Sequence, residues 1–218
     1  SIVIAWFCLI SLGTIVYLKG SLISFSSHNE QTQPSSATGK PFSIKMFKAL
    51  KRAEEHYRNK LQHTSKEEIS KLEKLTHRSL ELNWDSKFGF LPPSKPVPYR
   101  ECLHLYSLDT SLEGKVSVLI TFKDELASIL LRTITSIVIR TPENLLHELV
   151  LIDDGSLHDN QIEVEEYTAY FGVTLRWYKL NVSIGIANAR HYGLELTTGT
   201  VVVILDSHMV VSDMWLPP

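Results

Sequence analysis

An acidic residue and a histidine follow the most apolar strand-like segment of the chain. Residues 201–205 are all Val, Ile or Leu, and Asp206 and His208 come next, separated by Ser207. A continuous β-branched run is typical of a strand buried on both faces of a parallel sheet. Alternate residues of a strand point to the same side, with Cα atoms about 6.5 Å apart. A carboxylate and an imidazole so placed can bind one divalent cation such as Mn²⁺.

Apolar segments alternate with helical patterns from Lys115 to Asp206. The patterns predict strands at 116–122, 149–152, 173–178 and 201–205, and helices at 125–140, 160–171 and 184–196. This alternation predicts an α/β fold, a Rossmann-like parallel sheet with helices on both faces. Ligands of such sheets bind outside the carboxyl ends of the strands.

Polar residues at those strand ends are candidates for a nucleotide-sugar site. They are Thr121, Asp153, Asp154, and Asp206 with His208. Carboxylates there can accept hydrogen bonds from a ribose hydroxyl or a uracil N–H, and a metal would neutralise the diphosphate as it leaves. Taken singly, residues 153–156 are an ordinary turn and Arg190 is a solvated or structural cation. Their joint position at strand ends favours the site.

The sequence also excludes some function classes. It contains neither G-x-G-x-x-G nor G-K-[ST], which argues against a dinucleotide dehydrogenase and a P-loop NTPase. No nucleic-acid motif is present, so we expect no nucleic-acid partner.

The chain begins with an apolar run. Residues 2–18 carry no charge and end at Lys19. Seventeen residues are near the lower limit for a membrane-spanning helix and long for the apolar h-region of a signal peptide. We predict a transmembrane signal-anchor over residues 1–19, with a cleaved signal peptide as the alternative. Residues 20–96 then form a stem, which starts as a flexible linker rich in Ser, Gln, Thr and Pro over 20–40.

The stem contains a basic helical block. Met46, Leu50, Ala53 and Tyr57 recur at helical spacing. Residues 40–80 hold 11 Lys and Arg against 5 Glu, whereas the remainder to residue 218 holds 10 Lys and Arg against 18 Asp and Glu. We interpret the block as a solvated stalk; contact with anionic lipid headgroups is the alternative.

The stretch from residue 116 to 216 resembles the first half of the catalytic domain of polypeptide N-acetylgalactosaminyltransferases. The matching segments are residues 118–122 followed by Glu125, residues 130–133, 148–154, 189–190 and 205–208, Gly193, and Trp215-Leu216. The wider relation is to family-2-like glycosyltransferases of the GT-A fold, which usually end this strand in D-x-D. His208 indicates the narrower family.

The resemblance implies a function and a set of site residues. Members of the family are type II, single-pass Golgi membrane enzymes with a lumenal catalytic domain, here expected over residues 97–218. They use UDP-GalNAc and Mn²⁺ to add GalNAc to Ser or Thr of polypeptides, with retention at the anomeric carbon. By the resemblance, Asp206 and His208 are metal ligands. Also by the resemblance, Thr121, Asp154 and Ser207 contact the nucleotide sugar. Cys102 is expected to form a disulfide with a cysteine that this sequence does not contain. We therefore expect the sequence to be an N-terminal fragment of a longer protein.

Some positions depart from the family pattern. Ser183 stands where the family has an arginine that meets the donor, and Lys123-Asp124 replaces His-Asn. Asn188 replaces another arginine, and Met209 replaces a cysteine. A missing cation at 183 should weaken diphosphate binding, because charge-assisted hydrogen bonds are the strong ones. Three functions stay open: a peptide GalNAc-transferase, a GT-A transferase of a different sugar, and an inactive relative that acts as a membrane-anchored binding or regulatory protein.

Overall fold

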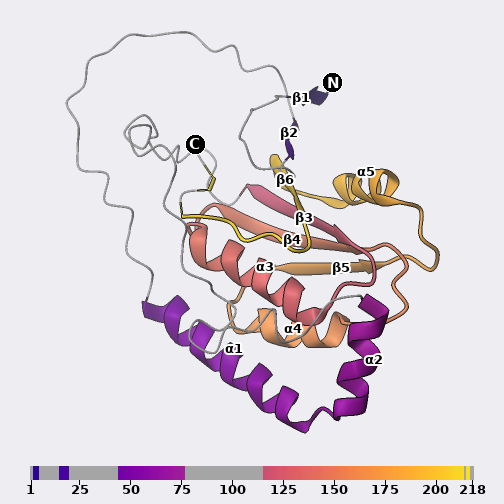
Figure 1. Ribbon diagram of the computed structural model, residues 1–218. Coiled ribbons are helices and arrows are strands. Elements are labelled where there is room, and N and C mark those ends of the chain that lie inside the picture. Colours follow the sequence, from indigo (N-terminus) through magenta and orange to yellow (C-terminus); the bar gives the residue numbers. More distant parts are fainter. Residues whose placement is uncertain (1, 5–14, 20–43, 77–114, 214, 217–218) are drawn as a thin grey trace.

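The computed structural model describes residues 2–4, 15–19, 44–76, 115–213 and 215–216, which form one sheet flanked by helices (Figure 1). The sheet has the strand order β1-β2-β6-β3-β4-β5. In chain order the elements are β1 (Ile2–Ile4), β2 (Ile15–Lys19), α1 (Ile44–His63), α2 (Lys66–Thr76), β3 (Val116–Phe122), α3 (Ala127–Arg140), β4 (Leu146–Asp153), α4 (Gln161–Ala169), β5 (Leu175–Lys179), α5 (Ile186–Leu196) and β6 (Val201–Asp206).

The predicted strands form the parallel part of the sheet. β3 pairs in parallel with both β4 and β6, and β4 pairs in parallel with β5. All of β3 and the first five residues of β6 are buried. The burial follows from the helices on both faces, which exclude water from the sheet. The predicted α/β fold with a parallel sheet and helices on both faces is confirmed.

The helices divide between the two faces (Figure 1). α5 covers one face, where Leu119, Val150 and Ile204 pack with Ala189 of the helix. α3 and α4 cover the other. Gly193 allows α5 to lie close to the sheet, because a Cβ at that position would be 2.4 Å from Leu119 Cδ1. The position of α5 matters for the site described below.

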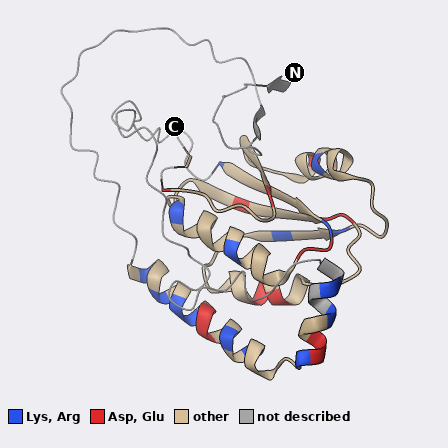
Figure 2. Ribbon diagram, in the orientation of Figure 1, with Lys and Arg blue, Asp and Glu red and all other residues tan. Residues whose placement is uncertain are grey.

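The basic helix α1 packs outside α3 and α4. The predicted stripe of Met46, Leu50, Ala53 and Tyr57 is buried in the core shared with α3 and α4. Lys and Arg residues recur along this helix, as the blue segments of Figure 2 show, and those at positions 45, 48, 51, 52, 58 and 60 are exposed. Lys60 Nζ lies 3.9 Å and 3.8 Å from carboxylate oxygens of two glutamates of α4. α1 is therefore part of the domain core on its inner face, which the interpretation as a solvated stalk did not include.

The N-terminal apolar run differs from its prediction. Ile2–Ile4 and Ile15–Lys19 are strands and not parts of a helix, whereas residues 5–14 lie outside the described residues. β2 pairs antiparallel with β6, and β1 with β2. The physical reason is that β6 presents an open edge, while Ile, Val and Tyr favour strands.

No helix within the described ranges combines the length and apolar character needed to cross a bilayer. The linker at 20–43 and the segment 77–114, which includes Cys102, lie outside the described residues. The disulfide of Cys102 therefore stays a prediction.

Candidate functional site

Three of the predicted site residues lie side by side at the carboxyl edge of the sheet. Thr121 is the Cα partner of Asp206 across β3 and β6, and of Ile152 across β3 and β4. Asp154 follows two residues after Ile152, and its N–H donates to the Phe122 carbonyl (2.8 Å), which extends the ladder. Because strand side chains alternate, Thr121, Asp154 and Asp206 all point to the face covered by α5.

Two buried polar atoms at this edge lack a hydrogen-bond partner among the described residues. They are Thr121 Oγ1 and Asp153 Oδ2. The other oxygen of Asp153 accepts from the Ser156 N–H at 2.7 Å, and Lys179 Nζ lies 4.0 Å from Oδ2. An unsatisfied buried polar group costs about 1–3 kcal/mol. Such groups at a binding edge are chemically suited to contact a polar ligand.

Asp154 is fully engaged by the loop that leads into α5. Its carboxylate accepts hydrogen bonds from Ser183 Oγ (2.8 Å), the Ile184 N–H (2.7 Å) and the Gly185 N–H (3.0 Å). Gly185 has φ 85°, a left-handed conformation that glycine adopts without a steric penalty. Asp154 thus holds this loop in place, and its predicted contact with the nucleotide sugar stays a prediction.

Asp206 is paired with a cation from α5. Arg190 Nη2 donates to Asp206 Oδ1 at 2.6 Å, and the two side chains are 25% and 29% exposed. The sequence interpretation set Arg190 aside as a solvated or structural residue. Gly193 was a usable signal, since residues three apart on a helix share a face and Gly193 lies against the sheet.

Ser207 and His208 turn toward a buried glutamate. Ser207 is buried, and its Oγ donates to Glu125 Oε2 at 2.8 Å. His208 is half-exposed, with Nδ1 3.7 Å from the same oxygen. The sequence included Glu125 only among the segments that carry the resemblance, not as a site residue. Its position just beyond the end of a predicted strand was the available signal.

The predicted metal ligands Asp206 and His208 have different partners in the structure, Arg190 and Glu125, and their role as ligands stays a prediction. Arg190 takes one oxygen of the Asp206 carboxylate and leaves the second for a cation. With Nδ1 of His208 turned toward Glu125, Nε2 lies on the opposite edge of the ring. Carboxylate and imidazole ligands suit Mn²⁺, and ligating histidines usually have a carboxylate at the other nitrogen. Within the part of the chain that the structure describes, no cluster of three or more His, Cys, Asp or Glu side chains could hold a metal ion.

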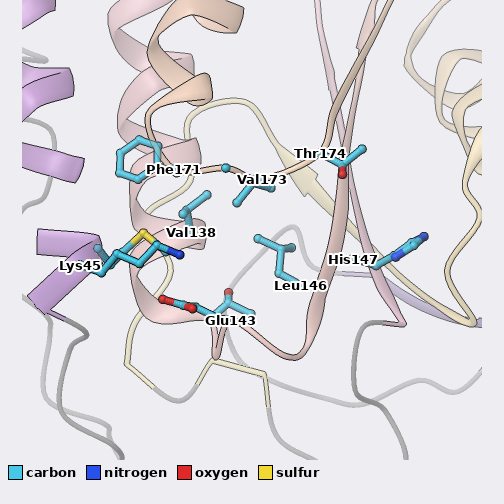
Figure 3. A pocket seen from close by; sticks show the side chains of 11 residues that line it. Lys45, Val138, Glu143, Leu146, His147, Phe171, Val173 and Thr174 are labelled. Carbon is cyan, nitrogen blue, oxygen red and sulfur yellow. The ribbon is translucent and has the colours of Figure 1, made fainter. Parts of the chain in front are cut away.

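A cavity of about 190 Å³ lies at the opposite end of the sheet. Lys45 of α1, Val138 of α3, Leu146 of β4 and Phe171 line it (Figure 3). It opens near the amino end of β4, whereas ligands of parallel sheets bind at the carboxyl ends. The cavity is therefore separate from the candidate site.

Part of the chain is similar in sequence to known proteins. Residues 117–218 match the family described as Glycosyl transferase family 2. Polypeptide N-acetylgalactosaminyltransferase 8 of Drosophila melanogaster is 40% identical over 103 residues, which cover 47% of this chain and 18% of the relative. Polypeptide N-acetylgalactosaminyltransferase 5 of Caenorhabditis elegans is 39% identical over 143 residues, which cover 65% of this chain and 20% of the relative.

One solved structure is described as GalNAc-T7 with UDP, GalNAc and Mn2+. Its sequence is 33% identical and the TM-score is 0.45; the match covers 50% of this chain and 20% of the chain in that structure. The chain spans about a fifth of the length of the curated relatives it matches. Over the matched part of the chain the protein is therefore similar to family 2 glycosyltransferases, and its relatives of about 40% identity are polypeptide N-acetylgalactosaminyltransferases.

Proposed function

We propose that the protein transfers GalNAc from UDP-GalNAc to Ser or Thr of polypeptides, with Mn²⁺ and with retention at the anomeric carbon. The observation that carries the proposal is the position of Asp206 at the carboxyl end of β6, next to Thr121, with His208 two residues further along the chain. The identity to polypeptide N-acetylgalactosaminyltransferases supports the choice of donor and acceptor. We further propose that the α/β domain is of the GT-A type.

In this proposal the chain's own residues bind and orient the donor. Asp206 and His208 would hold Mn²⁺, and the bound ion would supply Lewis-acid chemistry toward the diphosphate. Arg190 fixes the rotation of the Asp206 carboxylate through Oδ1. The buried Thr121 hydroxyl is placed to hydrogen-bond the nucleotide. Asp154 fixes the loop at 183–185, which borders the same crevice.

A non-catalytic relative is the second candidate, and one observation favours it. The loop that borders the crevice carries Ser183, and this residue donates to Asp154 and supplies no positive charge. Arg190 contacts the predicted metal ligand Asp206, and its charge is paired with that carboxylate. Such a protein would bind UDP without transferring sugar.

The direct test is a transfer assay with UDP-GalNAc, Mn²⁺ and a Ser/Thr peptide. We expect Asp206→Ala to lower the transfer rate on the order of 100-fold or more, because it removes a metal ligand. Glu195→Ala is the matched control: it removes an exposed carboxylate from α5 and should leave the rate unchanged.

Equal transfer by Asp206→Ala and the unaltered protein would contradict the proposal. UDP binding without transfer would favour the non-catalytic candidate. Transfer from a different UDP-sugar alone would favour a GT-A transferase of another specificity.

We also propose that the protein is a single-pass type II Golgi membrane protein with the catalytic domain in the lumen. The 17 uncharged residues from Ile2 to Leu18 support a membrane anchor. Pairing of β2 with β6 and insertion of the same residues into a bilayer exclude each other. Carbonate extraction of cell membranes separates the two: retention in the membrane pellet supports the anchor, and release contradicts it.

A further inference from the structure

Glu125 is a buried carboxylate between the segments that follow β3 and β6. Its side chain is only 6% exposed. Oε2 accepts from Ser207 Oγ at 2.8 Å, and Oε1 accepts from the Leu126 N–H at 3.3 Å. Asn160 Nδ2 donates to its backbone carbonyl at 2.6 Å. Burial of a carboxylate is unfavourable unless hydrogen bonds or charges compensate it, so a role at this position would account for its presence beside His208.

The imidazole of His208 faces this carboxylate. Nδ1 lies 3.7 Å from Oε2, which is longer than a hydrogen bond but close enough for the carboxylate to act on this side of the ring. A carboxylate on the Nδ1 side favours the tautomer with its proton on Nδ1. The lone pair is then on Nε2, where a metal can be bound.

The contact is held from two elements of the fold. Thr133 Oγ1 of α3 donates to the Ser207 carbonyl at 2.5 Å, which fixes the backbone just before His208. Ser207 Oγ fixes the Glu125 oxygen that faces the imidazole. The geometry of His208 is therefore set by buried contacts, although its ring is half-exposed.

We propose that Glu125 is a positioning residue that selects the tautomer and orientation of His208, so that Nε2 is available to a divalent cation. The inference rests on the proposed metal-dependent function and assigns Glu125 no contact with the substrate. The alternative is a purely structural carboxylate. Glu148 is the matched case, since it is also buried and hydrogen-bonded but lies near the start of β4.

Mn²⁺ binding, followed by the electron paramagnetic resonance signal of the free ion, tests the proposal without an activity assay. We expect Glu125→Gln to weaken Mn²⁺ binding about 10–100-fold, the usual effect of removing a carboxylate behind a ligating histidine. Glu148→Gln should lower the melting temperature and leave Mn²⁺ affinity within about twofold. Asp206→Ala should abolish the site.

Equal Mn²⁺ affinity in Glu125→Gln and the unaltered chain, with loss of binding in Asp206→Ala, would overturn the role of Glu125 and leave the metal site standing. Absence of a Mn²⁺ site in the unaltered chain would overturn both the metal site and the role of Glu125.

A second measurement needs no variant that might fail to fold. Long-range ¹H–¹⁵N spectra of the unaltered, metal-free chain at pH 8 report the tautomer of His208. A proton on Nδ1 supports the proposal, and a proton on Nε2 overturns it.

Discussion

Buried polar groups at the two ends of the parallel sheet differ in how completely they are hydrogen-bonded within the protein. At the amino end, Glu148 accepts from Ser117 Oγ (2.8 Å), the Thr198 N–H (2.6 Å) and Thr198 Oγ1 (2.9 Å). Arg176 Nη1 lies 3.2 Å from its other oxygen, and Ser117 Oγ in turn accepts from the Gly199 N–H. Both oxygens of this carboxylate are satisfied within the protein.

The carboxyl end is arranged otherwise. Thr121 Oγ1 and Asp153 Oδ2 are buried and make no hydrogen bond in the described ranges, and Arg190 contacts only one oxygen of Asp206. Asp154 at the same end is the exception, since both of its carboxylate oxygens accept hydrogen bonds. Unsatisfied polar groups reduce stability, and proteins tolerate them where a ligand supplies the missing contacts. We infer that Glu148 at the amino end contributes to folding, whereas the unsatisfied groups at the carboxyl end are suited to a polar ligand.

The largest effect on stability is expected from Glu148→Ala. The change leaves Arg176 and the Thr198 N–H without their buried partner, and we expect a loss of about 3 kcal/mol in the free energy of unfolding. Mn²⁺ affinity should not change. Urea denaturation measures the first quantity and a metal titration the second; a loss of Mn²⁺ binding in a variant that remains folded would contradict the division between the two ends.

A smaller effect on stability is expected from Gly193→Ala, a substitution in α5, the helix that also carries Arg190. The new Cβ would lie 2.4 Å from Leu119 Cδ1 and 2.8 Å from Ile152 Cγ1. Relief of this overlap moves α5 from the sheet, and we expect a loss of about 2 kcal/mol in stability. Because Arg190 lies on α5, Mn²⁺ affinity should change too. Unchanged stability and affinity would show that α5 is not held as closely as described.

Ser183→Arg tests the departure at the loop before α5. The substitution removes one hydrogen bond to Asp154 and adds a cation beside the crevice. Charge-assisted contacts are worth more than neutral ones, so we expect UDP in the presence of Mn²⁺ to bind about tenfold more tightly. Ser183→Ala is the matched control, with no gain in affinity. Calorimetry measures both, and equal affinities would show that position 183 does not face the diphosphate.

The smallest expected effect concerns pH. Burial raises the pKa of Glu148, but the hydrogen bonds from Thr198, Ser117 and Arg176 together lower it below its ordinary value. As pH falls through about 4.5, the unfolded chain takes up a proton before the native one, so stability decreases with falling pH in this window. Urea midpoints from pH 7 to pH 3 should fall less steeply in Glu148→Gln than in the unaltered chain. Equal slopes would contradict the contribution of Glu148.

Much of the fold follows from local sequence patterns. The predicted strand at 116–122 has the bounds of β3, because its residues are continuously apolar or small. The strand predicted at 149–152 is part of the longer β4 (Leu146–Asp153). The prediction began too late, because the polar residues His147 and Glu148 interrupt the apolar pattern at the start of the strand. The helix predicted from 125 begins at Ala127, because Leu126 is extended (φ −72°, ψ 140°).

Other features depend on contacts between distant segments. No local pattern shows that β6 has an open edge for β2 to pair with, so the run at 2–18 was predicted as a helix. Thr121, Asp154, Ser207 and the pair Asp206 and His208 were predicted for the site, and the structure brings them to one edge of the sheet. Arg190 and Glu125 were not assigned to the site, because the contacts that place them there span 16 and 82 residues of sequence and the local signals for them are weak.

The central claim is that Asp206 and His208 together bind a divalent cation at the carboxyl edge of the sheet. Anomalous diffraction at the manganese absorption edge, from crystals of the protein grown with Mn²⁺ and UDP, tests it directly. The account predicts one strong peak coordinated by an Asp206 carboxylate oxygen and His208 Nε2. A peak coordinated by neither side chain, or no peak at this edge with UDP bound, would contradict it.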